Sequence, residues 1–207
     1  MKKIVFDFGA VLFAWQPREL LRRELPHRVS DEAQAAHWEL QIFENYGGDW
    51  GEFDRGTVSV AELVQRISTR TGLAPAEVRA VVDAVPHALQ PDPGTLALMH
   101  ELGDAGHELY FLSNMPAPYA SHLEASHDFI QRFRSGVFSC RVQHKKPEPA
   151  IYRLAAQRFG AQAQELVFLD DNAANVQAAR ALGWNALLFT DAAQAGAEMR
   201  QAGWIGG

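Results

Sequence analysis

The chain has 207 residues, of which 47% are hydrophobic and 21% are charged, and its formal net charge at pH 7 is −6. The length and composition are typical of one globular domain, or of one domain that carries a sizeable insertion. The acidic balance and the lack of a long basic run argue against a nucleic-acid partner, because contacts to phosphates need concentrated positive charge.

Cysteine content and hydropathy indicate where the protein works. Cys140 is the one cysteine, so no intrachain disulfide can form, and this usage favours the cytoplasm. Asp7 interrupts the first apolar stretch, and no other stretch approaches the roughly 18 apolar residues of a membrane span. We therefore predict neither a signal peptide nor a membrane partner, and a monomer or homodimer would be ordinary.

Five short apolar runs are predicted to be buried strands, because they are rich in Val, Phe and Leu and show little alternation. In chain order they cover residues 3–8, 108–112, 136–140, 166–169 and 185–189. Helical patterns lie between or after the later runs, at 94–102, 118–126, 149–159, 173–182 and 191–201. This alternation of strand and helix predicts an α/β fold with a doubly wound, parallel, five-stranded sheet.

The connection between the first two predicted strands is far longer than a crossover requires. It contains four helical patterns, at 17–25, 31–44, 60–71 and 75–85, and Ser59 with Glu62 forms a plausible capping box before the third. Pro86, Pro91 and Pro93 are interpreted as a linker that returns to the sheet. We therefore predict an α/β core made of residues 1–14 and 94–207, and a helical cap made of residues 15–93.

Polar residues lie at the ends of four of the predicted strands, or in the segment that follows the strand. They are Asp7, Ser113 with Asn114, Lys146, and Asp170 with Asp171. Each group alone has an ordinary explanation as a helix cap, a turn or a surface lysine. In open α/β sheets, however, ligands bind at the carboxyl ends of the strands. The coincidence of all four groups at one edge therefore predicts a functional site.

The residue types at this edge indicate phosphate chemistry. Three neighbouring carboxylates repel one another, and a divalent cation relieves that repulsion. Oxygen ligands without a His–Cys cluster favour Mg²⁺, which commonly binds a few carboxylates and a phosphate. Lys146 adds a positive charge, and Ser113 and the backbone N–H of Asn114 can donate to substrate oxygens. Such a site resembles a phosphate receptor with a carboxylate nucleophile, which implies an aspartyl-phosphate intermediate.

Four segments resemble, in order, the motifs of the haloacid dehalogenase-like hydrolase superfamily: VFDFGAVLF, YFLSN, KKPEPAIY and VFLDDNAANVQAARALG. The resemblance implies a core strand order of 5-4-1-2-3 and a Mg²⁺-dependent phosphatase of a small phosphorylated metabolite. It also implies a role for each site residue. Asp7 is nucleophile and metal ligand, Gly9 binds metal through its carbonyl, and Asp170 and Asp171 complete the metal site. Ser113 and Asn114 bind the phosphoryl group, Lys146 balances charge, and Gly9 and Ala10 border the substrate. Asn175, four residues after Asp171, supports the site from behind its ligands.

Gly9 departs from the commonest form of this family, in which a second Asp follows the nucleophile by two residues and acts as a general acid. General acid–base catalysis is worth roughly 10²–10⁴-fold in rate. The pattern D-x-G resembles a branch that contains α-D-glucose-1-phosphate phosphatase and the N-terminal phosphatase domains of epoxide hydrolases. It favours a sugar 1-phosphate as substrate, because a sugar C1 hydroxyl is acidic enough to leave with little protonation.

Two other functions stay open at this point. One is a metal-independent 2-haloacid dehalogenase, although relatives of that kind usually carry an aromatic residue at the position of Gly9 and lack the Asp170–Asp171 pair. The other is a non-catalytic module that binds a phosphometabolite, although the intact Asp7 and Lys146 argue against it. In the cap, the polar and aromatic candidates for substrate contact are Trp38, Glu44, Asp49, Trp50, Phe53, Asp54 and Arg55, and of these we predict that Trp50 and Arg55 bind substrate.

Overall fold

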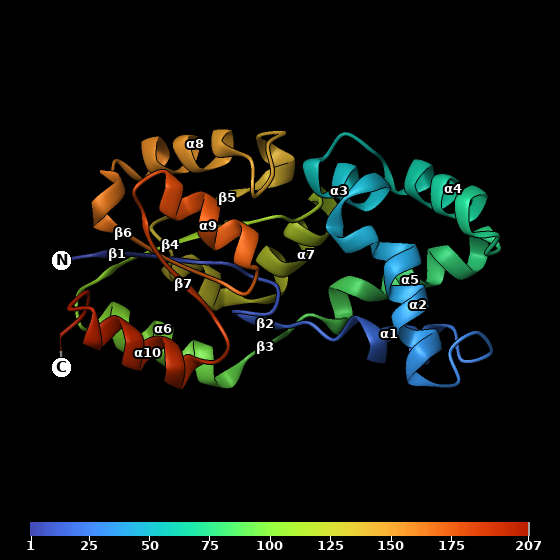
Figure 1. Ribbon diagram of the computed structural model, residues 1–207, viewed down its shortest axis with the longest axis horizontal. Helices are drawn as coiled ribbons and strands as arrows, with labels where there is room; N and C mark the ends of the chain where they lie inside the picture. The colour runs from blue at the N-terminus through green and yellow to red at the C-terminus, as the bar shows by residue number, and fades with distance from the viewer. Residues whose placement is uncertain (207) are drawn as a thin grey trace.

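The computed structural model describes residues 1–206 and contains a parallel sheet of five strands (Figure 1). The strands are β1 (Lys3–Phe6), β4 (Glu108–Ser113), β5 (Ser135–Phe138), β6 (Leu166–Asp170) and β7 (Asn185–Leu188). Their order is β5-β4-β1-β6-β7, and each neighbouring pair is parallel. When these five strands alone are counted from the N-terminus, the order from one edge is 5-4-1-2-3, so the predicted doubly wound sheet is present.

Helices cover both faces of this sheet. Two of them, α8 (Pro149–Phe159) and α9 (Ala173–Ala181), lie on one face, while α6 (Pro93–Asp104) and α10 (Ala192–Gln201) lie on the other (Figure 1). Consecutive residues of β1 accordingly belong to two separate hydrophobic clusters, with Ile4 and Phe6 in one and Val5 in the other. Burial on both faces explains why the predicted strands lack a polar alternation.

The remaining elements of the core are one helix and three short 3₁₀ turns. They are α7 (Ala117–Ser126), η2 (Asp128–Arg132), η3 (Ser139–Arg141) and η4 (Ala163–Glu165). Cys140 lies in η3, so the prediction that it ends the third strand is wrong; the strand stops at Phe138. None of the helices within residues 1–206 is long and apolar enough to cross a membrane.

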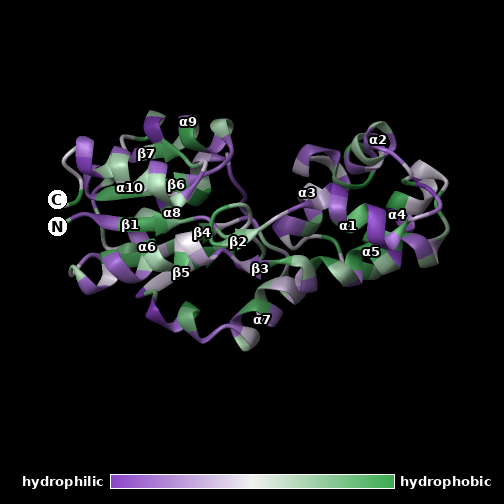
Figure 2. Cartoon of the chain, turned by 90° about the horizontal axis from the view of Figure 1, so that it is seen from below, coloured by the Kyte–Doolittle hydropathy of each residue, from purple (hydrophilic) through white to green (hydrophobic). Residues whose placement is uncertain are grey.

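The helices of the cap lie together at the end of the molecule opposite the N-terminus (Figure 1). They are α1 (Pro17–Glu24), α2 (Glu32–Phe43), η1 (Glu44–Tyr46), α3 (Gly48–Arg55), α4 (Val60–Thr71) and α5 (Pro75–Ala88). The chain enters and leaves the cap through two short antiparallel strands, β2 (Phe13–Ala14) and β3 (Gln90–Pro91) (Figure 2). The predicted capping box of Ser59 and Glu62 begins α4.

Two parts of the cap differ from the sequence prediction. Helix α3 was not predicted, because its first residues include glycines, which disfavour helices. Pro86 was interpreted as part of a linker but lies inside α5. A proline there cannot donate to the carbonyl of Val82, four residues earlier. The hydroxyl of Tyr119 in α7 donates to that carbonyl at 2.7 Å instead, so a contact from the core replaces the missing helix bond.

Gly136 makes room for a cluster of aromatic rings on the sheet. It pairs with Phe111 across β5 and β4. A Cβ atom at Gly136 would lie only 2.1 Å from the Phe111 ring. That ring cannot move aside easily, because it packs against Phe8 and Phe138 at centroid distances of 4.8 and 4.6 Å. Glycine is ordinarily unfavourable inside a strand. It is present here because the Phe111 ring occupies the space that a side chain at this position would need.

We predict that Gly136→Ala lowers the free energy of unfolding by about 1–3 kcal/mol, because the added methyl overpacks the aromatic cluster. Urea denaturation of the variant and the parent measures this loss. In the background of Phe111→Leu, which shortens the opposing side chain, the same substitution should cost clearly less. Equal losses in both backgrounds would contradict the packing explanation.

Candidate active site

The nucleophile candidate, Asp7, follows β1 directly and begins a tight turn. Its N–H donates to the carbonyl of Leu169 at 3.0 Å, which keeps it in register with β6. The carbonyl of Phe8 then accepts from the N–H groups of Val11 and Phe13, and Ala10 adopts a left-handed φ of 58°. A non-glycine residue in this region carries backbone strain, which clusters at functional sites. The turn holds Asp7, Gly9 and Ala10 against one cavity.

Lys146 lies between two carboxylates at the centre of the site. Its Nζ is 2.7 Å from an oxygen of Asp7 and 2.6 Å from an oxygen of Asp170, and the residue is only 3% exposed. A buried ammonium requires such partners, because an unpaired charge in the interior is costly. The two acids also raise the pKa of Lys146 against the opposing effect of burial, so this lysine stays protonated.

Asn114 holds the backbone of Lys146 in place. Its side-chain amide donates to the carbonyl of Lys146 at 3.0 Å, and its side-chain oxygen accepts from the N–H of Lys146 at 2.8 Å. The side chain of Asn114 is therefore used for positioning, which leaves its backbone N–H as the group predicted to donate to a phosphoryl oxygen. The residue still lines the cavity.

Asn175 has a supporting place in the site and holds Asp170. Its amide donates to both carboxylate oxygens of Asp170 at 3.0 and 3.1 Å, and the N–H of Asn172 donates to Asp170 at 2.8 Å. Asp170 is thereby fully buried and fully partnered. Asp171, the next residue, is exposed and lines the cavity, so the two neighbouring acids have different environments.

Three carboxylates converge as the sequence predicts. Asp7, Asp170 and Asp171 each offer an oxygen within 4.8 Å of the others. Burial raises the pKa of Asp7 to about 7, with Lys146 opposing and the two other acids reinforcing the change. Although Asp171 is exposed to the cavity, desolvation by the surrounding protein and the charge of Asp170 also raise its pKa. Crowded hard oxygen donors of this kind fit a divalent cation such as Mg²⁺.

Ser113 ends β4 with a hydroxyl that lacks a partner. The residue is 1% exposed, and no group within residues 1–206 forms a hydrogen bond with its Oγ. Buried hydroxyls are normally satisfied, so an orphaned one at the wall of a cavity indicates a ligand oxygen. The predicted role of Ser113 toward a phosphoryl group agrees with this placement.

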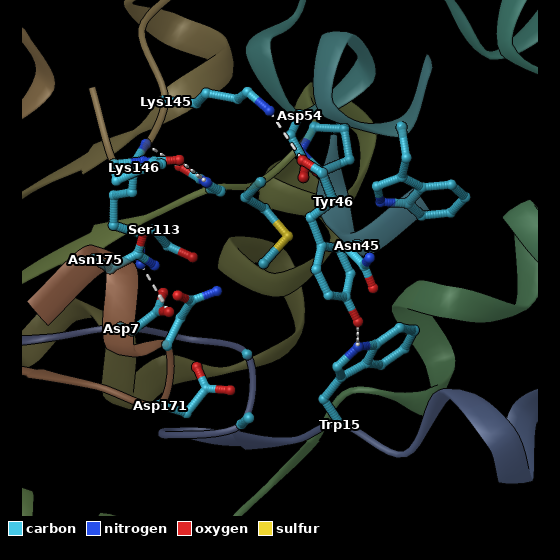
Figure 3. Close-up of a pocket in the computed structure, with 18 of the residues that line it drawn as sticks. Asp7, Trp15, Asn45, Tyr46, Asp54, Ser113, Lys145, Lys146, Asp171 and Asn175 are labelled. Carbon is cyan, nitrogen blue, oxygen red and sulfur yellow. Dashed lines mark hydrogen bonds and ion pairs between the residues drawn. The ribbon is translucent and has the colours of Figure 1, made fainter. Parts of the chain in front are cut away.

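The cavity itself has a volume of about 400 Å³ and lies between the sheet edge and the cap (Figure 3). Much of its wall is apolar or aromatic, from Trp15, Tyr46, Trp50, Val85, Leu89, Met115, Pro116 and Tyr119. The indole of Trp15 donates to the hydroxyl of Tyr46 at 2.6 Å (Figure 3). Trp50, a predicted substrate contact, thus lines the cavity, and most of the other wall residues come from segments in which the sequence carries no motif.

Arg55 occupies a different place from the one predicted. Its guanidinium pairs with Glu148 and Glu52 and donates to the carbonyl of Gln143. It is not among the described residues that line the cavity. Its neighbours Glu148 and Gln143 belong to the core, so Arg55 joins the cap to the core and lies outside the lining of the cavity. Lys145 makes a similar connection, donating to the carbonyl of Tyr46 at 2.9 Å.

Asp54 in α3 is a buried acid on the cap side of the cavity (Figure 3). It is 4% exposed, and its carboxylate forms no hydrogen bond or ion pair with any described residue. Burial raises its pKa to about 7, although Lys145 and Lys146 act in the opposite direction. An acid in this environment is a mixture of neutral and ionised forms near neutral pH.

Comparisons with known proteins agree with this geometry. A family model described as haloacid dehalogenase-like hydrolase matches residues 3–183. Sesquiterpene phosphatase astK of Aspergillus oryzae is 28% identical over 204 residues, which are 97% of this chain and 95% of that protein. A solved structure of the HAD family enzyme bt-2542 of Bacteroides thetaiotaomicron, in complex with magnesium and inorganic phosphate, is also similar. The match has a TM-score of 0.71 at 18% identity and covers 92% of this chain and 94% of that enzyme's chain.

A dehalogenase also shares the fold. The L-2-haloacid dehalogenase of Xanthobacter autotrophicus, with chloropropionic acid covalently bound, has a TM-score of 0.66 at 19% identity. The match covers 90% of this chain and 76% of that one. At these identities, the likeness to either solved structure shows the common fold and not a common substrate.

We predict that Asp54 makes the protein less stable as the pH rises from about 4 to about 7. In this range the unfolded chain has lost the Asp54 proton, whereas the folded protein retains it, so folding becomes less favourable. Asp54→Asn should remove this loss and be more stable than the parent by a few kcal/mol at about pH 8. Urea denaturation at about pH 5 and pH 8 measures the difference.

Glu52→Gln provides a matched control for this measurement. Glu52 lies on the same helix but its side chain is 42% exposed, and its pKa is lowered, chiefly by the hydroxyl of Thr57. Its replacement should leave the pH dependence of stability between about pH 5 and pH 8 unchanged. A variant at Asp54 that kept the parent's pH dependence would contradict the assignment.

Proposed function

Since the chain belongs to the haloacid dehalogenase-like hydrolase family, we propose that it is a Mg²⁺-dependent phosphatase that hydrolyses a small phosphomonoester. One observation carries the proposal: Lys146 holds Asp7 beside two further acids and next to the orphaned hydroxyl of Ser113. This arrangement combines a carboxylate nucleophile with donors for an anionic group. The relation to a phosphatase over nearly the whole chain supports the same activity.

The residues have distinct parts in the proposed reaction. The carboxylate of Asp7 attacks phosphorus, the leaving-group oxygen departs, and water then releases phosphate from the aspartyl-phosphate intermediate. Lys146 favours the ionised form of Asp7 and stabilises the phosphoryl charge, and Ser113 donates to a phosphoryl oxygen. Asp7, Asp170, Asp171 and the carbonyl of Gly9 would hold Mg²⁺, which supplies positive charge to the phosphoryl oxygens when bound.

The two alternative functions are less well supported by the site. A dehalogenase that works without metal has no use for the pair Asp170 and Asp171, of which Asp171 faces the cavity. A module that only binds a phosphometabolite does not require a carboxylate poised beside a buried ammonium.

We predict Mg²⁺-dependent hydrolysis of p-nitrophenyl phosphate that stops when EDTA is added. Asp7→Asn should lower the rate by at least about 10³-fold, because an amide cannot act as the nucleophile. Release of p-nitrophenolate measures both effects. Asp83→Asn, which removes an exposed acid from the cap, should leave the rate unchanged. Hydrolysis that survives in Asp7→Asn, or chloride release from 2-chloropropionate in EDTA, would overturn the proposal.

Two classes of substrate are compatible with the proposal. Gly9 favours a leaving group that needs little protonation, such as that of a sugar 1-phosphate. The apolar wall of the cavity favours a second class, the phosphate of an apolar alcohol, because burial of apolar surface favours binding. The name of the sesquiterpene phosphatase relative indicates that it acts on a phosphate of this second class. The lining residues thus support the apolar class more directly than the sugar.

We predict that farnesyl phosphate has a higher kcat/KM than glucose 1-phosphate, by at least about tenfold, because its chain fits the apolar wall. Glucose 1-phosphate should in turn exceed glucose 6-phosphate, whose leaving group is more basic. Phosphate release with Mg²⁺ measures all three. Trp50→Ala should raise KM for farnesyl phosphate more than for glucose 1-phosphate. A preference for either sugar phosphate over farnesyl phosphate would reject the apolar class.

A further inference from the structure

The proposed reaction leaves open the source of the proton that the leaving oxygen needs. Gly9 has no side chain, and a Cβ there would meet nothing within 4 Å, so no neighbour in the described chain fills this space. An alcohol is a poor leaving group as its anion, and protonation by a positioned acid accelerates its departure. Another group that faces the cavity is therefore needed for an ordinary alcohol.

Most titratable groups that line the cavity are already occupied. Lys146 is held by two acids, and Lys145 donates to the carbonyl of Tyr46. The hydroxyl of Tyr46 accepts from Trp15, and burial raises the pKa of Tyr46 to about 12. The hydroxyl of Tyr119 donates to the carbonyl of Val82. None of these groups within the described chain offers a proton that is easily transferred near neutral pH.

Among the described acids of the cavity, Asp54 is the one outside the carboxylate cluster. Asp7 and Asp171 belong to that cluster. The Asp54 side chain lies on the cap wall, buried and without a partner, and its backbone carbonyl accepts from the hydroxyl of Ser139 in the core. In phosphoryl transfer the attacking and leaving oxygens lie roughly in line. The leaving oxygen therefore departs on the side of phosphorus opposite Asp7, and Asp54 lies across the cavity from Asp7 (Figure 3).

We propose that Asp54 is the proton donor to the leaving-group oxygen, supplied by the cap in place of the acid absent at Gly9. The proposal rests on the phosphatase reaction proposed above. As the bond between Asp7 and phosphorus forms, the bond from phosphorus to the leaving oxygen breaks and its electron pair stays on that oxygen. The leaving oxygen takes the proton of Asp54, so the products are a neutral alcohol, the aspartyl phosphate and the Asp54 carboxylate.

The second half of the reaction restores both acids. Water attacks phosphorus, and the bond from phosphorus to the Asp7 oxygen breaks with its electron pair returning to the Asp7 carboxylate. The Asp54 carboxylate accepts a proton from the attacking water and becomes neutral again. One water molecule is consumed and one phosphate is released, with no other reactant.

The surroundings of Asp54 suit both protonation states. Burial raises its pKa to about 7, which is near the optimum for an acid that must donate and then recover a proton. The charges of Lys145 and Lys146, which precede α8, lower the pKa of Asp54. The charge of Asp54 in turn raises the pKa values of three neighbouring groups: Tyr46 in η1, Tyr119 in α7 and Cys140 in η3. Arg66 and Arg70 of α4 pair with Asp49 instead.

The experiment compares two aryl phosphates of similar shape. p-Nitrophenolate leaves without a proton, whereas phenolate is more basic and benefits from an acid. For Asp54→Asn we expect kcat/KM on phenyl phosphate to fall by roughly 10²–10⁴-fold, and that on p-nitrophenyl phosphate by less than about tenfold. The fall of the parent's kcat/KM on phenyl phosphate above about pH 7 should also disappear. Equal losses on both substrates, or no loss, would overturn the proposal.

Two further variants separate the possible failures. Gly9→Asp in the Asp54→Asn background places an acid where the cavity has space, so it should restore much of the rate on phenyl phosphate. Glu52→Gln, which replaces a partly exposed acid of the same helix, should leave kcat/KM for both aryl phosphates unchanged. If the parent hydrolyses neither aryl phosphate, the phosphatase function itself fails. If Asp7→Asn abolishes hydrolysis while Asp54→Asn affects both substrates equally, only the role of Asp54 fails.

Discussion

The buried ammonium of Lys146 is the contact on which the rest of the site depends. It touches Asp7 at the end of β1 and Asp170 at the end of β6, and its backbone is held by Asn114, just past the end of β4. Three adjacent strands of one sheet are thus joined through a single side chain. Without it, the two acids would remain buried without a countercharge, which is strongly unfavourable. The contact explains how a cluster of carboxylates can be kept close together in the interior.

The cap completes the site by adding apolar surface and one unpaired acid. Its aromatic residues close the cavity above the sheet edge, and Arg55 and Lys145 connect it to the loop that carries Lys146. Asp54 is the exception in this wall, because its burial without a partner works against stability. Strained or destabilised groups of this kind are commonly kept where they serve a reaction.

The fold and the core of the site could be predicted from local patterns. Apolar runs without alternation indicate strands buried on both faces, and polar residues at their ends meet because parallel strands share one edge. Helix α3 could not be predicted, since its glycines oppose a helix and tertiary packing overrides that preference. The same holds for Pro86, because its place in α5 depends on a hydroxyl from Tyr119, far along the chain.

The sequence by itself determined which polar groups gather at the site: Asp7, Ser113, Lys146 and Asp171 come together because each lies at or beyond the carboxyl end of a strand of one parallel sheet. The tertiary structure decided which groups are free to act. The side chain of Asn114 binds the backbone of Lys146, and the side chain of Arg55 pairs with Glu148 and joins the cap to the core. Asp54, by contrast, lines the cavity without a partner among the described residues. The physical reason is that the strands and the polar residues at their ends follow from local pattern, but the partner of a polar side chain depends on how distant segments pack.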